Sequence, residues 1–327
     1  MPPFFNTRVT NYKYERFYYL ADAIKDFDLI CFQELFDMLN YRKSDLIMKS
    51  GENNFIDFAT SPSPSFTSPG DSDGGLLTLS KFEIVKQDSY TYPVSVDTDS
   101  GAAKGIVYTK LNVENTGHFI HVFNTHTQAT YAEFKDTYKV NYMVRILQLH
   151  QMRQFIEKTL RDQKIYKSDL ILLMGDLNID ARDCNIPKTL FNKDDFIWKG
   201  FLQGDDYDSI PEMEIMTHLL SGGGKDRIVH LTKGSDGSFP VTYGDFVEVD
   251  GRRFPKETNL TDKDSEVLGQ SLDHAMILEW RGAEDGRSNH GVRVVGGSCK
   301  VNPFYVDDPR FGQLSDHYGI EFLVERY

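Results

Sequence analysis

Short, continuous apolar runs bounded by polar residues mark the predicted strands of this chain. Asp28–Phe32 and Asp169–Met174 are the clearest, and their lack of alternation is typical of strands that are buried on both faces. Apolar residues are also dense in Lys104–Val113 and His118–Asn124, which indicates two further strands of a mixed or antiparallel sheet. The same criteria predict strands at Gly75–Leu79, Phe82–Lys86, Leu272–Trp280 and Tyr318–Val324.

Two stretches show the period of a helix instead. We expect one helix at Tyr14–Lys25 and a longer one at Phe134–Asp162, whereas Phe201–Gln270 is rich in loop-forming residues. Because strands come in groups separated by helices, the pattern favours a layered α/β or α+β sandwich, with a pair of sheets flanked by helices. The longer helix has apolar residues at steps of three and four, which stack on one face: Tyr142, Ile146, Leu149, Met152, Ile156 and Leu160.

The charge balance limits the possible partners. The 327 residues include 36 Lys and Arg against 49 Asp and Glu, which gives a net charge of −13. A protein that coats a nucleic acid normally carries a basic patch, because neutralised phosphates release counterions. The composition therefore argues against extended nucleic-acid contact. An acidic protein can still bind a phosphate through a metal ion that lies between the two negative groups.

The sequence shows no sign of a membrane span. The longest apolar runs, such as Leu170–Met174, fall far short of the ~20 residues that a helix needs to cross a bilayer. The opening residues Met1–Thr10 lack the apolar segment of a signal peptide. We expect a soluble protein that is cytoplasmic or peripheral at a membrane, or secreted if a signal has been removed.

Polar side chains suited to catalysis lie where several predicted strands begin or end. Functional residues tend to lie in such places, where rigid strands bring side chains to one rim. Each residue alone has an ordinary structural interpretation, such as an Asx turn for Gly175–Asn178 or a backbone-bonded edge histidine for His126. Their joint occurrence favours a common site, made of Gln33, Glu34, Asn124, His126, Asp176, Asn178, Asp273, Asp316 and His317.

These residues fall within five short motifs that follow one another along the chain. The set resembles the motifs of the endonuclease/exonuclease/phosphatase superfamily, which includes pancreatic deoxyribonuclease, apurinic endonucleases, inositol 5-phosphatases and neutral sphingomyelinases. Because the resemblance spans residues 31–320, it implies one catalytic domain over residues 1–327. It also implies a DNase I-like fold, a four-layer α/β sandwich of two packed mixed β-sheets flanked by helices. The motifs are CFQELFD (Cys31–Asp37), NTHTQA (Asn124–Ala129), GDLNID (Gly175–Asp180), LDH (Leu272–His274) and SDHYGI (Ser315–Ile320).

Within the superfamily the chain most resembles the Mg²⁺-dependent neutral sphingomyelinases. That family follows its catalytic histidine with Gln-Ala, as Gln128-Ala129 follows His126 here. Asp99 and Lys104 have the spacing of an aspartate–lysine pair that resembles the activation switch of membrane-bound members. The resemblance therefore assigns substrate-binding or regulatory roles to Asp99, Lys104, Gln128 and Asn259.

A metal site is expected around Glu34. Carboxylate oxygen is the ligand that Mg²⁺ prefers, and this ion typically uses only one or two protein carboxylates. The family's first strand ends in an asparagine, to which Asn6 corresponds, and Asp316 is expected to support the site directly or through water. The implied cofactor is Mg²⁺, with Mn²⁺ or Co²⁺ as substitutes.

The remaining strand-end residues receive catalytic roles. His317 is the predicted general base because imidazole titrates at about pH 6.5 when unperturbed, and Asp273 would orient it. Asp176 would orient the attacking water. Asn178 and His126 would donate hydrogen bonds to the phosphoryl oxygens as charge develops there.

The function expected from these assignments is hydrolysis of sphingomyelin to ceramide and phosphocholine by in-line attack of an activated water. Expected partners are sphingomyelin or a related phospholipid, met by peripheral membrane contact, and no partner protein is inferred. A nuclease or a phosphoinositide phosphatase of the same fold remains an alternative. A binding module that keeps the fold without the chemistry is a second alternative, which would require at least one broken motif.

Overall fold

A six-stranded mixed sheet forms the centre of the molecule. The computed structural model describes residues 12–36, 42–62, 72–113, 117–130, 138–182, 185–187, 209–255, 269–285 and 290–327. In the large sheet β6 and β7 run parallel, and the other neighbouring strands run antiparallel. Its strand order is β10 (Arg227–His230), β13 (Asp273–Glu279), β7 (Leu170–Asp176), β6 (His118–His126), β5 (Gly105–Val113) and β4 (Ile84–Thr91).

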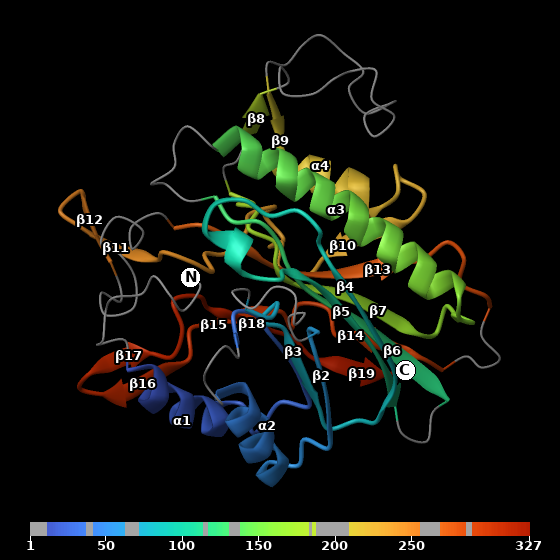
Figure 1. Ribbon diagram of the computed structural model, residues 1–327, viewed down its shortest axis with the longest axis horizontal. Helices are drawn as coiled ribbons and strands as arrows, with labels where there is room; N and C mark the ends of the chain where they lie inside the picture. The colour runs from blue at the N-terminus through green and yellow to red at the C-terminus, as the bar shows by residue number, and fades with distance from the viewer. Residues whose placement is uncertain are drawn as a thin grey trace.

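Two helices cover one face of this sheet. α3 (Tyr138–Arg161) and α4 (Glu212–Leu220) lie together on the upper side in Figure 1. The predicted apolar stripe of α3 points into the main hydrophobic core, where it packs with Phe123 and Leu173 of the sheet. No helix in the described ranges has both the length and the apolar character that crossing a membrane would take.

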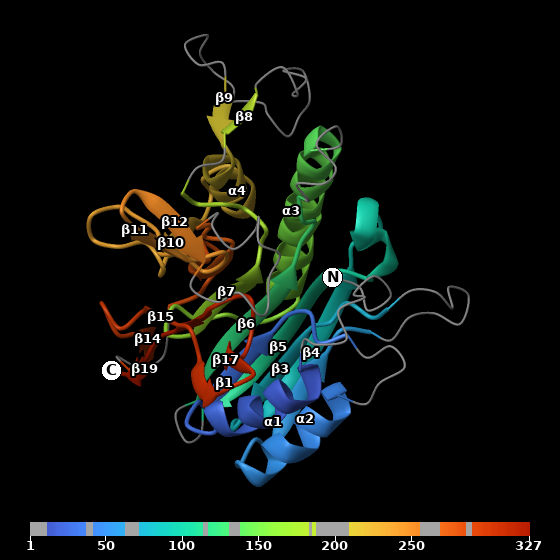
Figure 2. The same cartoon turned by 90° about the vertical axis from the view of Figure 1, so that its left-hand side faces the viewer.

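A smaller sheet and two helices form the opposite side. β1 (Leu29–Phe32), β3 (Leu77–Ser80) and β2 (Asp57–Thr60) pair antiparallel in the order β1-β3-β2. α1 (Lys13–Ala23) and α2 (Arg42–Glu52) cover its outer face (Figure 2), with Phe17 and Leu46 in the shared core. The inner face of β1 packs on β6 and β7 through a separate apolar cluster. These layers confirm the predicted four-layer α/β sandwich.

Short paired strands complete the described chain. One 3-10 helix, η1 (Asp97–Gly101), precedes β5. The pairs are β8 (Asn185–Pro187) with β9 (Ser209–Pro211), β11 (Phe246–Val249) with β12 (Arg252–Pro255), β14 (Val292–Val294) with β19 (Val324–Arg326), β15 (Lys300–Asn302) with β18 (Gly319–Glu321), and β16 (Tyr305–Asp308) with β17 (Phe311–Gln313).

The structure corrects three predictions of secondary structure. Tyr318–Val324 is not one strand, because β18 and β19 pair with different partners, β15 and β14. The segment that we expected to be loop-rich contains α4 and β10, which are too short for their periods to be recognised. The strand expected at Phe82–Lys86 begins at Ile84 and continues to Thr91 as β4. Its largely exposed polar side chains suit an edge strand but break the apolar pattern.

The topology brings several strand ends to one edge of the large sheet. The parallel register of β6 and β7 places His126 opposite Asp176. β13 runs antiparallel to β7 and begins at Asp273, which also lies opposite Asp176. Gln33, just after β1, donates a hydrogen bond to Asn124 of β6 at 2.7 Å. The side chains at these strand ends therefore meet at a common rim.

Candidate active site

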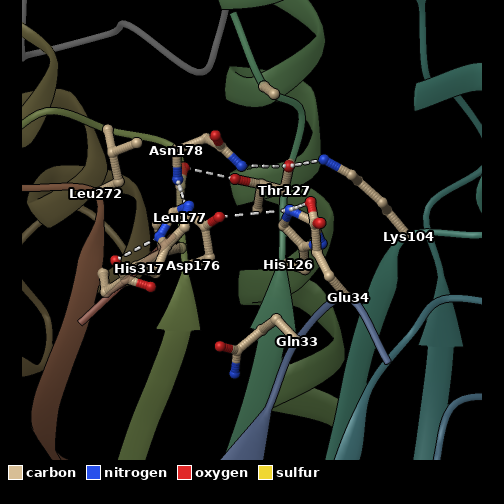
Figure 3. Close-up of polar contacts among 12 residues, drawn as sticks. Gln33, Glu34, Lys104, His126, Thr127, Asp176, Leu177, Asn178, Leu272 and His317 are labelled. Atoms are coloured by element: carbon tan, nitrogen blue, oxygen red, sulfur yellow. Dashed lines mark hydrogen bonds and ion pairs between the residues drawn. The ribbon is translucent and has the colours of Figure 1, made fainter. Parts of the chain in front are cut away.

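The rim carries a histidine between two carboxylates. His126 Nε2 lies 3.5 Å from an oxygen of Asp176 and 4.0 Å from an oxygen of Glu34. His126 and Asp176 are buried, whereas the Glu34 side chain is 47% exposed. Figure 3 shows the three side chains pointing toward one another from β6, from the end of β7 and from the segment after β1. Burial and the charge of Lys104 lower the pKa of His126 to about 3, so this imidazole is neutral at neutral pH.

A second histidine lies on the other side of Asp176. His317 Nδ1 donates a hydrogen bond to Asp273 Oδ2 at 2.9 Å. Burial alone would lower the pKa of His317, but the carboxylate of Asp273 raises it well above the ordinary histidine value. Tyr243 packs against the imidazole with its ring centroid 4.7 Å away. These contacts fix the orientation of His317 and leave Nε2 as its available nitrogen.

The site concentrates negative charge where a divalent cation would relieve it. Asp176, Asp273 and His317 each offer a ligand atom, and these atoms lie within 4.8 Å of one another. Burial and the charge of Asp273 raise the pKa of Asp176, which is the electrostatic sign of two crowded carboxylates. Glu34 adds a third carboxylate beside His126. Carboxylate oxygens are the donors that Mg²⁺ prefers, and Asp273 is already bonded to His317, so the exposed carboxylate of Glu34 is the donor at this rim that best fits the ion.

The backbone geometry of Gly175–Asn178 explains why a glycine precedes Asp176 and how Asn178 is positioned. Gly175 has φ +145°, and a Cβ there would lie 2.0 Å from the carbonyl oxygen of Thr125 on β6. Only glycine therefore allows β7 to approach β6 so closely before Asp176. Asp176 Oδ1 accepts the N–H of Asn178 at 2.8 Å, which is the Asx turn that the sequence suggested. The turn places Asn178 at φ 50° with Nδ2 donating to the Thr127 carbonyl at 3.0 Å.

A buried ion pair supports the site from behind. Lys104 donates to Asp99 at 2.7 Å and to the Thr127 carbonyl at 2.8 Å, and the lysine and aspartate are each 2% exposed. Asp99 also accepts the N–H of Ala129 at 2.7 Å. The pair therefore holds the loop that follows His126. Neither residue belongs to the lining of the cleft.

Gln128 is equally buried and also stands outside the cleft lining. Its Oε1 accepts the N–H of Val96, and its Nε2 donates to the carbonyls of Val96 and Ala129. In the structure this side chain binds backbone rather than facing the cleft. Asn6 and Asn259, which the sequence also put forward, lie outside the described residues.

Sequence reasoning missed Arg145 of α3. This fully buried side chain forms a two-bond ion pair with Glu212 of α4 at 2.6 and 2.9 Å. It also donates to the Gln128 carbonyl at 2.8 Å, so it holds the loop after His126 against both helices. An arginine within an amphipathic helix carries no sequence signal for such a role, because its partner lies far away in the chain.

A cleft of about 1650 Å³ opens at this rim. Its polar end brings together eight of the residues that the sequence put forward, and Tyr243 and Arg145 join them in the lining. Asp316 is exposed beside His317, where its carboxylate contributes to the raised pKa of the histidine. The eight are Gln33, Glu34, His126, Asp176, Asn178, Asp273, Asp316 and His317.

Comparison with known proteins identifies the family. Residues 5–211 match the model of the Endonuclease/Exonuclease/phosphatase family. A sphingomyelinase of Dictyostelium discoideum is 32% identical over 92% of this chain and 72% of its own length. Staphylococcus aureus beta toxin has the same fold, with a TM-score of 0.59, 19% identity and coverage of 95% of this chain and 92% of the toxin chain. A variant of that toxin, solved with bound magnesium ions, superposes with a TM-score of 0.58 at 19% identity over 95% of this chain and 91% of the toxin chain. The chain therefore belongs to the endonuclease/exonuclease/phosphatase family.

Proposed function

We propose that this protein is a Mg²⁺-dependent phosphodiesterase of the phospholipase C type that cleaves sphingomyelin into ceramide and phosphocholine. The observation that carries the proposal is the meeting of Glu34, His126 and the Asp273–His317 pair at one rim of the large sheet. The sphingomyelinase name of the Dictyostelium relative supports this substrate over a nucleic acid or a phosphoinositide. All five motifs are intact in the sequence, which disfavours a binding module that has lost its catalytic residues.

His317 acts as the general base. Its Nδ1–H is committed to Asp273, so Nε2 takes the proton from the attacking water. The carboxylate fixes the tautomer and stabilises the imidazolium that forms. Asp176, buried between the two histidines, accepts a hydrogen bond from the same water and orients it toward phosphorus.

His126 and Asn178 stabilise the negative charge that develops on the phosphoryl oxygens. A neutral His126 donates one hydrogen bond without adding a charge to the site. Asn178 lines the cleft and uses one N–H on the Thr127 carbonyl, so its second N–H is the proposed donor to the phosphoryl oxygen. One preorganised donor of this kind is typically worth about 3 kcal/mol in the transition state.

Glu34 is the principal metal ligand in this proposal, with Asn6 and Asp316 contributing directly or through water. A bound Mg²⁺ supplies Lewis-acid chemistry, which neutralises phosphoryl charge and stabilises the departing ceramide oxygen. Mn²⁺ and Co²⁺ are proposed to substitute, since both also bind oxygen ligands. The exposure of Glu34 leaves room for the waters that Mg²⁺ normally keeps.

Three buried residues influence the reaction indirectly, because they bind the loop after His126 and do not line the cleft: Asp99, Lys104 and Gln128. Lys104 holds the Thr127 carbonyl that also binds Asn178, so breaking the ion pair with Asp99 would disturb two phosphate-binding groups at once. We assign this pair a regulatory role and Gln128 a supporting one. Asn259 is proposed to contact substrate.

Residues 1–327 are proposed to form one catalytic domain that meets the membrane peripherally. The C-terminal region supplies His317, which completes the site on β7 and β13, so the site requires both ends of the chain. The substrate lies in a bilayer, and the cleft opens at the rim of the large sheet, so we propose that the domain approaches the substrate from the membrane surface. A location in the cytoplasm or at a membrane is consistent with this mode of action.

The proposal is tested by assaying three substrates side by side: sphingomyelin vesicles, plasmid DNA and a phosphoinositide. We expect phosphocholine release from sphingomyelin, abolished by EDTA and restored by excess Mg²⁺, with at most weak action on the others. Cleavage of DNA or release of inorganic phosphate without phosphocholine would replace the proposal with one of the same-fold alternatives. No turnover of any substrate would favour the binding module.

A further inference from the structure

Two basic residues occupy the first turn of α2, where they are unfavourable for the helix. The N-terminus of a helix carries a partial positive charge, so Arg42 and Lys43 are repelled there. Lys43 is nevertheless only 4% exposed and forms an ion pair with Asp73, which is 7% exposed. A lysine is almost never buried unless it is paired. The position of Lys43 is therefore explained by Asp73 rather than by the helix.

Asp73 is connected to the proposed metal ligand by two hydrogen bonds in series, the first accepted by its side chain and the second between backbone groups. Its Oδ1 accepts the N–H of Gly75 at 3.2 Å, while Oδ2 faces Lys43. The carbonyl of Gly75 then accepts the N–H of Leu35 at 2.9 Å. Leu35 is the residue directly after Glu34, so the ion pair and the metal ligand belong to one hydrogen-bonded unit.

Close packing strengthens this connection. Gly75 has φ +67°, and a Cβ there would lie 3.0 Å from Cα of Glu34 and 2.9 Å from the ring of Phe36. Glu34 itself has φ 59°, a left-handed conformation that is strained for a residue with a side chain. Such strain persists at functional sites only where the surroundings hold it. The 73–75 segment lies against Glu34 and holds it.

Ser72, which directly precedes this segment, connects it to the region of the Asp99–Lys104 ion pair behind His126. Ser72 donates its N–H to the Gly101 carbonyl at 2.9 Å, and its carbonyl accepts the N–H of Ala103 at 3.1 Å. Ala103 directly precedes Lys104, which holds Thr127. The segment is thus fixed on one side by the Lys43–Asp73 pair and on the other by the Asp99–Lys104 region.

We infer that Lys43 is a positioning residue for Glu34. By neutralising Asp73 inside the fold it fixes residues 73–75 against the strained backbone of Glu34, and it thereby aims the Glu34 carboxylate into the cleft. The inference rests on the proposed function, in which Glu34 binds Mg²⁺. Replacing Lys43 removes a charged partner of a buried carboxylate, which raises the cost of keeping Asp73 in place and is expected to shift residues 73–75.

The test is a calorimetric titration of Mg²⁺ into the substrate-free protein. Lys43→Met, which keeps the length of the side chain without its charge, should bind Mg²⁺ about 10–100-fold more weakly than the wild type, the usual effect of losing an outer partner of a metal ligand. In a Glu34→Gln background the same change should cause no further loss, because Lys43 acts through Glu34. Arg153→Met is the matched control: it breaks a buried ion pair with Asp226 far from the rim, and should lower Tm while leaving Mg²⁺ affinity unchanged.

Wild-type Mg²⁺ affinity in folded Lys43→Met would overturn the inference, and so would an equal loss in the Glu34→Gln background. Wild-type affinity in Glu34→Gln alone would instead overturn the metal role of Glu34, and with it the inference. If Lys43→Met does not fold, Asp73→Asn replaces it, since the amide keeps an acceptor for Gly75. That variant is held to the same two comparisons.

Discussion

The Nδ1 atom of His317 lies 2.9 Å from Oδ2 of Asp273, although the two residues are far apart in the sequence. This contact orients the imidazole and raises its pKa, because the carboxylate favours the charged form. The pair therefore sets both the direction and the strength of the proposed base.

Asp273→Asn should shift the pH dependence of turnover. A general base must be unprotonated, so activity rises as the pH passes upward through the pKa of His317. The amide removes the charge that raises this pKa, so the acidic limb of the kcat profile should move to lower pH. The maximum rate should fall by about 10²–10⁴-fold, because the base is weaker and poorly oriented. An unshifted acidic limb would show that another group sets it.

His317→Ala should abolish turnover without unfolding the protein. Loss of a general base typically costs about 10²–10⁴-fold in rate. The side chain is 26% exposed, so its removal should leave the circular dichroism spectrum and Tm close to those of the wild type. His290→Ala, an exposed histidine on the surface, is the control and should retain full activity. Wild-type turnover in the His317 variant would remove this residue from the mechanism.

Arg145→Met should destabilise the fold strongly. The substitution leaves the buried carboxylate of Glu212 without its charged partner, which typically costs about 3–5 kcal/mol. Urea unfolding measures the difference. Arg227→Met removes an exposed ion pair with Glu279 and should change the free energy of unfolding by less than about 1 kcal/mol. Equal effects of the two changes would mean that Arg145 is not fixed by Glu212 as the structure shows.

Gly175→Ala should damage the site more than the fold elsewhere. The new Cβ would overlap the Thr125 carbonyl and force β7 away from β6 between Asp176 and His126. We expect kcat/KM to fall at least about tenfold, since small misplacements of catalytic groups are costly. Gly51→Ala is the matched control, because nothing lies within 4 Å of its Cβ and alanine favours the helix. Similar kinetics in both variants would contradict this role for the close strand approach.

The sequence predicted those parts of the fold that depend on the residue pattern within a single strand or helix. β1, β6, β7 and β13 were found because each is a dense apolar run. Glu34, His126 and Asp176 were recognised because they stand at the ends of such strands within known motifs, and His317 because it stands in a motif just before the last predicted strand. The site depends on the register of β6 and β7, which places His126 opposite Asp176.

The remaining features depend on long-range partners that no local pattern reveals. Lys43 and Arg145 look like ordinary helix residues until Asp73 and Glu212 are brought to them by the fold. β4 was misplaced because an edge strand tolerates polar residues on both faces.

The most direct test of the central claim is phosphocholine release from sphingomyelin vesicles as a function of Mg²⁺ concentration, measured for the wild type and Glu34→Gln after removal of metal with EDTA. The account predicts no phosphocholine release from either protein without Mg²⁺. Adding Mg²⁺ should restore release by the wild type, and Glu34→Gln should need a much higher Mg²⁺ concentration for the same rate. Undiminished release in EDTA, or identical Mg²⁺ curves for the two proteins, would contradict it.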